Sequence, residues 1–294
     1  MLIKFKKEGE YAIKHSYTLY SLAGGIMNEI IAVAKKNINE QLNLPFSIYS
    51  SHKEQMINNV PVLKPLLIFI LNGKKQLGKS NAVECNSGTF VFLSNSSRVD
   101  MRNIPSQEEY FAVLIDFDHE DFSELPQNTA PHIEYIKGEI CPVIEKALLQ
   151  YIEFSSVAPS NVIKHRKREI LEILYHSGYV DVCNIDSPPS LSEKVHSMIS
   201  SDLSFEWSVD HIASNLFMSA STLRRKLKNE GNNIQDIRNR SRLSHGLHLL
   251  QTSQFNIGNI AELCGYQSQS RFTEQFKLLF GMTPREIRRS KMID

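Results

Sequence analysis

The most regular hydrophobic pattern in the chain lies in residues 207–289, where apolar side chains recur at helical spacing. One apolar face runs through residues 209–216, and a break of two residues follows. Ser219 can then begin a second helix, because its hydroxyl can accept a hydrogen bond from an unpaired backbone N–H. In that helix Leu223 and Leu227 lie roughly 40° apart, on one inner face. The pattern predicts helix, short turn and helix, the layout of a DNA-reading helix-turn-helix.

The outward face of the second helix is basic. Its members lie roughly 100° to 200° away from Leu223. They are Ser221, Arg224, Arg225 and Lys228. Arginine matches the two acceptors that guanine presents in the major groove. For a single helix, a solvated basic face is the ordinary alternative, so one occurrence of the pattern does not establish DNA reading.

The same pattern occurs again at residues 260–277. Ser268 follows Ser219 by 49 residues, and Phe272 follows Leu223 by the same interval. The repetition favours a duplicated helix-turn-helix over a chance basic helix.

Residues 240–250 predict a helix that links the two copies, with Leu243, Leu247 and Leu250 facing inward. Gly265 suits a turn that needs a left-handed backbone. Two recognition helices joined in this way could enter successive major grooves, about 34 Å apart.

These residues resemble the AraC/XylS family of bacterial transcription regulators. The resemblance covers about residues 191–289, including the closing stretch 280–287. Residues 202–207 and 216–227 are most similar to the enterobacterial and vibrio virulence regulators within the family.

Three positions depart from the family pattern. Phe217 stands where many members have glycine, and Gly246 stands in the linking helix where alanine is usual. The glycine costs roughly 0.5–1 kcal/mol of helix propensity. Glu274 occupies an outward place that many members give to a basic or small residue, which affects the base preference of the second copy.

We expect two sets of DNA contacts. The base-contacting residues are Ser221, Arg224 and Arg225 in the first copy, and Gln269, Ser270, Arg271, Thr273 and Glu274 in the second. The phosphate-contacting residues are Lys228, Lys277, Arg285, Arg288 and Arg289. Phosphate contacts supply affinity without sequence information.

Residues 60–122 have the signals of short strands. Residues 66–71 are an apolar run, and Asn72-Gly73 predicts a hairpin to a following strand. Residues 89–93 and 110–117 add two more strands, which together predict a small sandwich or barrel. The order is similar to the cupin-like N-terminal domain that is common in the family.

Helical patterns flank this region. Residues 141–154 predict a helix with Pro142 in its first turn, and residues 162–175 predict another. The resemblance implies that such helices dimerise, although they could equally cover the sheet. Residues 12–22 have strand-like content, and residues 29–33 are compatible with a short helix.

The composition fits two domains in 294 residues. Residues 191–294 hold 14 Lys and Arg against 10 Asp and Glu, whereas residues 1–190 hold 19 against 22. We predict an α+β chain with a cupin-like sensing and dimerising domain at 1–183 and a linker at 184–190. An all-α domain with two helix-turn-helix copies follows at 191–294.

Other classes of protein find little support. The N-terminus lacks the apolar core of a secretory signal, and the longest apolar run, residues 65–71, is too short for a membrane span. The four cysteines have no paired spacing, and the histidines form no His-x-His pair of a metal-binding cupin. No phosphate loop or nucleophile with a base stands out. We therefore expect a cytoplasmic protein without catalytic site, metal or cofactor.

The predicted function is sequence-specific DNA binding that regulates transcription. The resemblance implies an activator that binds double-stranded DNA, contacts RNA polymerase and forms a homodimer. It also implies a small apolar ligand such as a fatty acid, with Lys4, Lys6 or Lys74 as the counter-charge. Two alternatives stay open: control of the N-terminal domain by a protein partner, and an enzyme with a DNA-binding tail.

Overall fold

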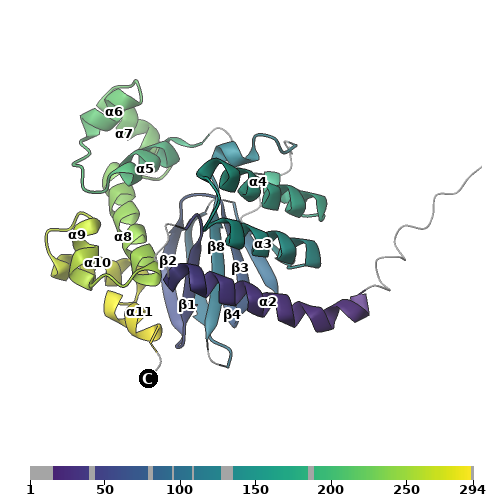
Figure 1. Ribbon diagram of the computed structural model, residues 1–294. Helices are drawn as coiled ribbons and strands as arrows, with labels where there is room; N and C mark the ends of the chain where they lie inside the picture. Colours follow the sequence, from purple (N-terminus) through teal and green to yellow (C-terminus); the bar gives the residue numbers. More distant parts are fainter. Residues whose placement is uncertain are drawn as a thin grey trace, which may run out of the picture. The chain divides into compact units, whose positions relative to one another are not determined.

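The computed structural model describes residues 16–39, 44–78, 82–94, 96–107, 109–126, 135–184 and 189–292 (Figure 1). Packing divides the chain into two compact regions. One consists of Met1–Pro45 and Ile140–Ile173, and the other of Phe46–Glu139 and Leu174–Asp294. The β-rich segment and the C-terminal helices therefore share one compact region, although helices separate them in the sequence.

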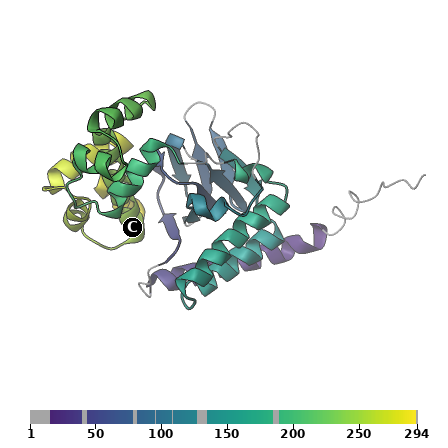
Figure 2. The same ribbon diagram turned by 90° about the horizontal axis from the view of Figure 1, so that it is seen from above.

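The first region is helical (Figure 2). It contains α2 (Ser16–Asn39), α3 (Pro142–Phe154) and most of α4 (Ser160–His176). The Asn37 side-chain amide donates to the Ile152 carbonyl oxygen at 3.0 Å, so α2 and α3 are tied together. The helices predicted at 141–154 and 162–175 are confirmed, and Pro142 occupies the first turn of α3.

The strand-like reading of residues 12–22 is wrong from Ser16 onward, where α2 begins. Residues 12–15 lie outside the described residues. Its aromatic and β-branched content favours a strand, but content does not reflect the period of the apolar positions. The period is helical further along, where Ile30 and Ala34 are both buried one turn apart.

The β-rich segment forms two antiparallel sheets, which together we call the sandwich. Their orders are β1-β8-β3-β6-β9 and β2-β7-β4-β5. The strands are β1 (Ser47–Ser51), β2 (Gln55–Val62), β3 (Leu66–Asn72), β4 (Lys74–Leu77), β5 (Val83–Asn86), β6 (Thr89–Leu93), β7 (Ser96–Ile104), β8 (Tyr110–Asp116) and β9 (Tyr135–Glu139). Apolar residues of both sheets share one core, including Ile68 and Val91 from one sheet and Leu77 and Met101 from the other. The expected small β-domain is confirmed, as two stacked sheets rather than a closed barrel.

Asn72-Gly73 does not make the predicted hairpin. β3 pairs with β6 and β8, whereas β4 pairs with β5 and β7 in the other sheet. The dipeptide still supplies the left-handed backbone, with φ +78° at Gly73, but for a corner that crosses between sheets. A Cβ at Gly73 would lie 2.6 Å from the Ile104 carbonyl oxygen, so a side chain would not fit there.

The C-terminal part is all-α among the residues described. Its helices are α5 (Leu191–Ser201), α6 (Val209–Asn215), α7 (Ala220–Asn229), α8 (Ile234–Thr252), α9 (Ile257–Leu263), α10 (Gln269–Phe280) and α11 (Pro284–Ser290). Short 3-10 turns occur earlier, at His119–Phe122 and Val180–Cys183. None of the described helices combines the length and apolar character that crossing a bilayer requires.

The predicted linking helix is confirmed as α8, and it belongs to two cores. Its first turns give Ile234 and Ile237 to the core around α6 and α7. Its later turns give Leu243, Leu247 and Leu250 to the core around α9 and α10. Figure 1 shows the two helix pairs near opposite ends of α8.

Gly246 has a packing reason to be glycine. A Cβ at this position would lie 2.8 Å from ring atoms of Phe272 and 3.3 Å from the Cys264 sulfur. Both residues are fully buried, so neither has free space to move into. Glycine at position 246 lowers the helix propensity of α8, but it also allows α8 to approach the Phe272 ring closely.

We predict that Gly246→Ala destabilises the protein, by about 1–3 kcal/mol, because overpacking outweighs the helix-propensity gain. Denaturant unfolding of the full chain measures it. Gly25→Ala in α2 is the matched control, since nothing lies within 4 Å of its added Cβ, and it should be neutral or stabilising. Stabilisation by Gly246→Ala would show that the Phe272 ring adjusts without cost.

Candidate nucleic-acid interface

The first helix-turn-helix consists of α6, its turn and α7. The Ser219 hydroxyl accepts from the Thr222 backbone N–H at 3.2 Å and caps α7, as the sequence predicted. Leu223 and Leu227 are buried on the inner face. Lys226 and Lys228 lie in the last turn, where their positive charges interact favourably with the negative end of the helix dipole.

The turn of the first helix-turn-helix places Phe217 in the left-handed region, with φ +53°. The Met218 backbone N–H donates to the Ala213 carbonyl at 3.0 Å, which closes α6. The Phe217 side chain is 98% exposed, so no packing among the described residues offsets the strained backbone. A bulky residue in this conformation is a genuine outlier.

The second helix-turn-helix repeats this geometry with one more residue in its turn. Gly265, with φ +73°, takes the left-handed position, and the Tyr266 N–H donates to the Ala261 carbonyl at 2.9 Å. Ala261 follows Ala213 by 48 residues, whereas the capping Ser268 follows Ser219 by 49. The inserted residue is therefore in the turn, and both helix pairs keep the same internal register.

The core of the second copy is aromatic. Phe272, Phe276 and Phe280 are fully buried along one face of α10, and consecutive rings lie 5.5 and 4.6 Å apart between centroids. Edge-to-face and tilted pairs of this kind add about 0.5–1.5 kcal/mol each beyond burial. This face fixes which residues of α10 point outward.

The residues predicted to contact bases lie on the outward faces of α7 and α10. Thr273 is half-buried, and the rest are exposed: Ser221, Arg224, Arg225, Gln269, Ser270, Arg271 and Glu274. Within the described residues, the guanidinium groups of Arg224, Arg225 and Arg271 form no ion pair or hydrogen bond. Their guanidinium groups are thus available to an acceptor outside the chain.

The predicted phosphate contacts divide into two groups. Lys228, Lys277, Arg285 and Arg289 are exposed. Arg288 is half-buried, and its guanidinium donates to the Phe255 carbonyl oxygen at 2.9 Å. Burial lowers the pKa of Arg288. Its side chain holds the segment before α9, which leaves it less free to reach a phosphate.

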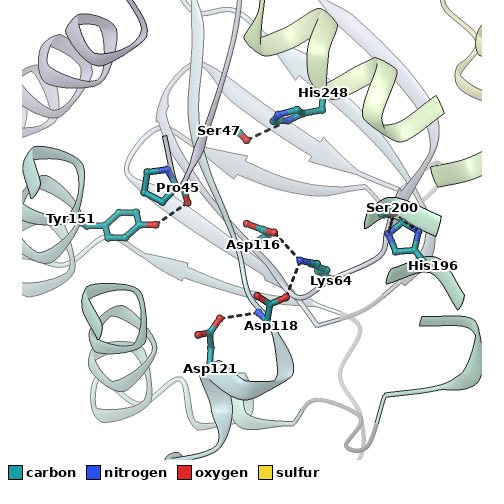
Figure 3. A network of polar contacts seen from close by, with 10 residues as sticks. All are labelled: Pro45, Ser47, Lys64, Asp116, Asp118, Asp121, Tyr151, His196, Ser200 and His248. Carbon is teal, nitrogen blue, oxygen red and sulfur yellow. Dashed lines mark hydrogen bonds and ion pairs between the residues drawn. The ribbon is translucent and has the colours of Figure 1, made fainter. Parts of the chain in front are cut away.

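Polar groups of the sandwich also lie close to the C-terminal helices (Figure 3). Lys64 pairs with Asp118 at 2.8 Å and Asp116 at 3.7 Å, and the ring of His196 on α5 lies near this cluster. Burial, and secondly the Lys64 cation, lower the pKa of His196 to about 4. On α8, the His248 ring nitrogen Nδ1 lies 3.4 Å from the Ser47 hydroxyl oxygen.

Sequence reasoning missed Lys75, which is 2% exposed inside the sandwich. Its ammonium donates to the Asn103 side-chain oxygen at 2.8 Å and lies 5.7 Å from the centroid of the Tyr110 ring. Burial lowers the pKa of Lys75 to about 8. Lys74, one of the lysines named from the sequence, is exposed and pairs with Glu84 at 3.2 Å. Lys4 and Lys6 lie outside the described residues. Strand alternation with the inward Leu77 was the signal that could have identified Lys75.

Comparison with known proteins agrees with this geometry. A family model described as a helix-turn-helix domain matches residues 212–290. The transcriptional regulator SirC of Salmonella typhimurium is 39% identical over 98 residues, which is 33% of each chain. The C-terminal domain is of the AraC/XylS type.

Other relatives match this AraC-type domain over the same extent. The porin thermoregulatory protein EnvY of Escherichia coli is 37% identical over 95 residues, 32% of this chain and 38% of the relative. The HTH-type transcriptional regulator GadX of Escherichia coli is 35% identical over 98 residues, 33% of this chain and 36% of the relative. The chain thus spans little more than a third of the length of the curated relatives it matches.

Solved structures match over a longer range. A structure of ToxT from Vibrio cholerae covers 84% of this chain and 98% of that chain, with a TM-score of 0.62 and 18% identity. A structure of ToxT with bound unsaturated fatty acid has a TM-score of 0.59 at 18% identity, covering 84% of this chain and 95% of that one. The two-domain fold is therefore shared, with a β-rich part joined to the AraC-type domain.

We predict that Phe217→Gly stabilises the protein by about 1 kcal/mol, because glycine adopts the left-handed conformation without steric cost. Urea unfolding measures the change in the free energy of unfolding. Phe205→Gly, at a partly exposed position that is not among the positive-φ residues, is the control and should not stabilise. A loss of stability in Phe217→Gly would mean that the ring contributes packing in solution.

Proposed function

We propose that the chain is a sequence-specific DNA-binding regulator of transcription that acts in the cytoplasm. The observation that carries the proposal is the pair of helix-turn-helix copies built on one helix, each with its polar face opposite its core. The relatives of this domain are described as transcriptional regulators, which supports a binding protein rather than an enzyme.

In this proposal α7 and α10 enter successive major grooves. Arg224 and Arg225 are the main base-reading residues of the first copy, because Arg can donate two hydrogen bonds to guanine. Glu274 in the second copy can accept from the cytosine amino group. The other proposed base contacts are Ser221, Gln269, Ser270, Arg271 and Thr273. The proposed phosphate anchors are Lys228, Lys277, Arg285 and Arg289, with Arg288 in a supporting position.

The rest of the regulatory function is inferred from the family resemblance. It comprises homodimerisation through α3 and α4 and activation by contact with RNA polymerase. The proposed domains are residues 1–183, a linker at 184–190 and residues 191–294.

We predict that Arg225→Ala weakens binding to a duplex selected by the wild-type protein by about 1–3 kcal/mol and relaxes preference at one base pair. Titration at fixed salt on the selected and a random duplex measures both effects. Lys226→Ala is the control, because this exposed side chain points about 100° away from Arg225 and should change affinity little.

Two outcomes of this titration count against the assignment. Equal losses of affinity on both duplexes would make Arg225 a phosphate contact. A wild-type protein that selects no sequence from random DNA would overturn the proposed function itself.

We further propose that the sandwich binds an apolar carboxylic acid, with Lys75 as the counter-charge. The buried Lys75 ammonium has one described hydrogen-bond acceptor and no carboxylate partner among the described residues. The Tyr110 hydroxyl and the Ser51 hydroxyl, on cross-strand neighbours, are buried without a hydrogen-bond partner. The Lys75 ammonium has three N–H donors, and both hydroxyls can also donate, which favours an anionic head group. Apolar side chains surround these groups in the core. The fatty acid in the ToxT structure supports this class of ligand.

We predict that oleate raises the melting temperature of the full chain by several degrees, since a ligand at about 100 times its Kd adds ~2.7 kcal/mol. Lys75→Met should abolish the shift, because methionine keeps the volume and removes the charge. Lys74→Met, one residue away on the exposed face, should retain it. Equal shifts in both variants would exclude Lys75 as the counter-charge, and no shift in the wild type would exclude this ligand.

A further inference from the structure

The outer edge of β2 lies against the second helix-turn-helix. Just before this edge strand, the backbone N–H groups of His52 and Lys53 donate to the Ser290 carbonyl oxygen at 2.7 and 3.0 Å. The Asn59 side-chain amide donates to the Leu279 carbonyl at 3.1 Å. The backbone groups of an edge strand usually face solvent. Here α10 and α11 contact this edge instead.

The close approach continues at the end of α10. Gly281 caps this helix with φ +77°, and a Cβ there would lie 2.6 Å from the Asn58 side-chain nitrogen. The positive φ favours glycine at this position, and a side chain there would also displace the amide of Asn58 on β2.

β2 also supplies a side chain to the core of the second helix-turn-helix. Ile57 is 3% exposed and belongs to the same apolar cluster as Phe276, Phe280 and Leu250. Its neighbour Met56 points the other way and is 57% exposed. This core therefore contains a residue that precedes it by roughly two hundred positions in the chain.

Gln55 lies two residues before Ile57 on the same face of β2 and adds a buried polar contact. It is fully buried, accepts from the amides of Asn103 and Gln251 at 3.0 Å each, and donates to the Ser290 hydroxyl at 2.7 Å. Asn103 in turn accepts from Lys75. One glutamine thus connects the polar row of the sandwich with α8 and α11.

The described core of the first helix-turn-helix is built without the sandwich. Every residue of its described core lies between 191 and 237, so no strand contributes to it. The sandwich therefore contributes a core residue to the second copy, whereas the described core of the first copy contains none from a strand.

We propose that β2 is a structural part of the second helix-turn-helix, so that Gln55 and Ile57 position α10 and the sandwich controls recognition of the second half-site alone. This inference rests on the proposed DNA-reading function. Gln55 and Ile57 are positioning residues, since neither lies on an outward face of the helices.

The test compares full-length Gln55→Leu with wild type on three duplexes. One is the duplex selected by the wild-type protein, and the others have the first or the second half-site scrambled. Leucine keeps most of the volume and removes three hydrogen bonds, so affinity for the selected duplex should fall about tenfold. On the duplex with the second half-site scrambled, the variant and the wild type should bind equally. Met56→Ala, on the opposite face of the same strand, should match wild type on all three.

Ser290→Ala provides a second route if Gln55→Leu does not fold. It removes the acceptor of Gln55 from the α11 side and should give the same half-site-selective loss, to a smaller extent. Equal losses on both scrambled duplexes, unchanged affinity, or tighter binding by folded variants would each overturn the proposal. If the wild type selects no duplex, the proposed function fails before this inference is reached.

Discussion

The arrangement of the DNA-binding domain depends on one constraint: α8 is buried in two cores at once. Ile234 and Ile237 are held by the first helix-turn-helix, and Leu243, Leu247 and Leu250 by the second. The helix has 19 residues and is therefore about 28 Å long. A helix fixed at both ends sets distance and rotation between α7 and α10 in a way that a flexible linker could not. The length of α8 is of the same order as the ~34 Å between successive major grooves.

The sequence allowed much of the helical part to be predicted, because helical period and caps are local signals. Ser219 and Ser268 cap their helices as expected, and the inward faces follow from Leu223 and Phe272. The sequence pattern also predicted where several strands lie, but not which strands pair with one another. Asn72-Gly73 specifies a left-handed backbone, and that conformation serves a corner between sheets as well as a hairpin.

The candidate site was predicted in part, for a related reason. Exposure of the outward residues follows from the helical period, whereas the engagement of Arg288 depends on a carbonyl 33 residues away. Contacts such as Gln55 with Ser290, separated by 235 residues, have no local signature. Lys75 is the exception, because strand alternation with Leu77 places it inside the sandwich.

The two helix-turn-helix copies have diverged in how they are stabilised. Leu223 and Leu227 fill the first core, and Phe272 and Phe276 occupy the corresponding positions in the second. Phenylalanine rings are larger than leucine side chains, so they need room on the side of α8 and additional apolar contacts on the opposite side. Both follow because protein interiors are close-packed. Gly246 has no side chain, so α8 can approach the Phe272 ring closely. Ile57, on the edge strand of the sandwich, packs against the same core. Gly246, which departs from the family pattern, and Ile57 therefore serve the same aromatic core, which a strand of the sandwich completes. The first copy has smaller core side chains, and its described core consists of residues between 191 and 237. Its backbone strain lies in the exposed turn, at Phe217.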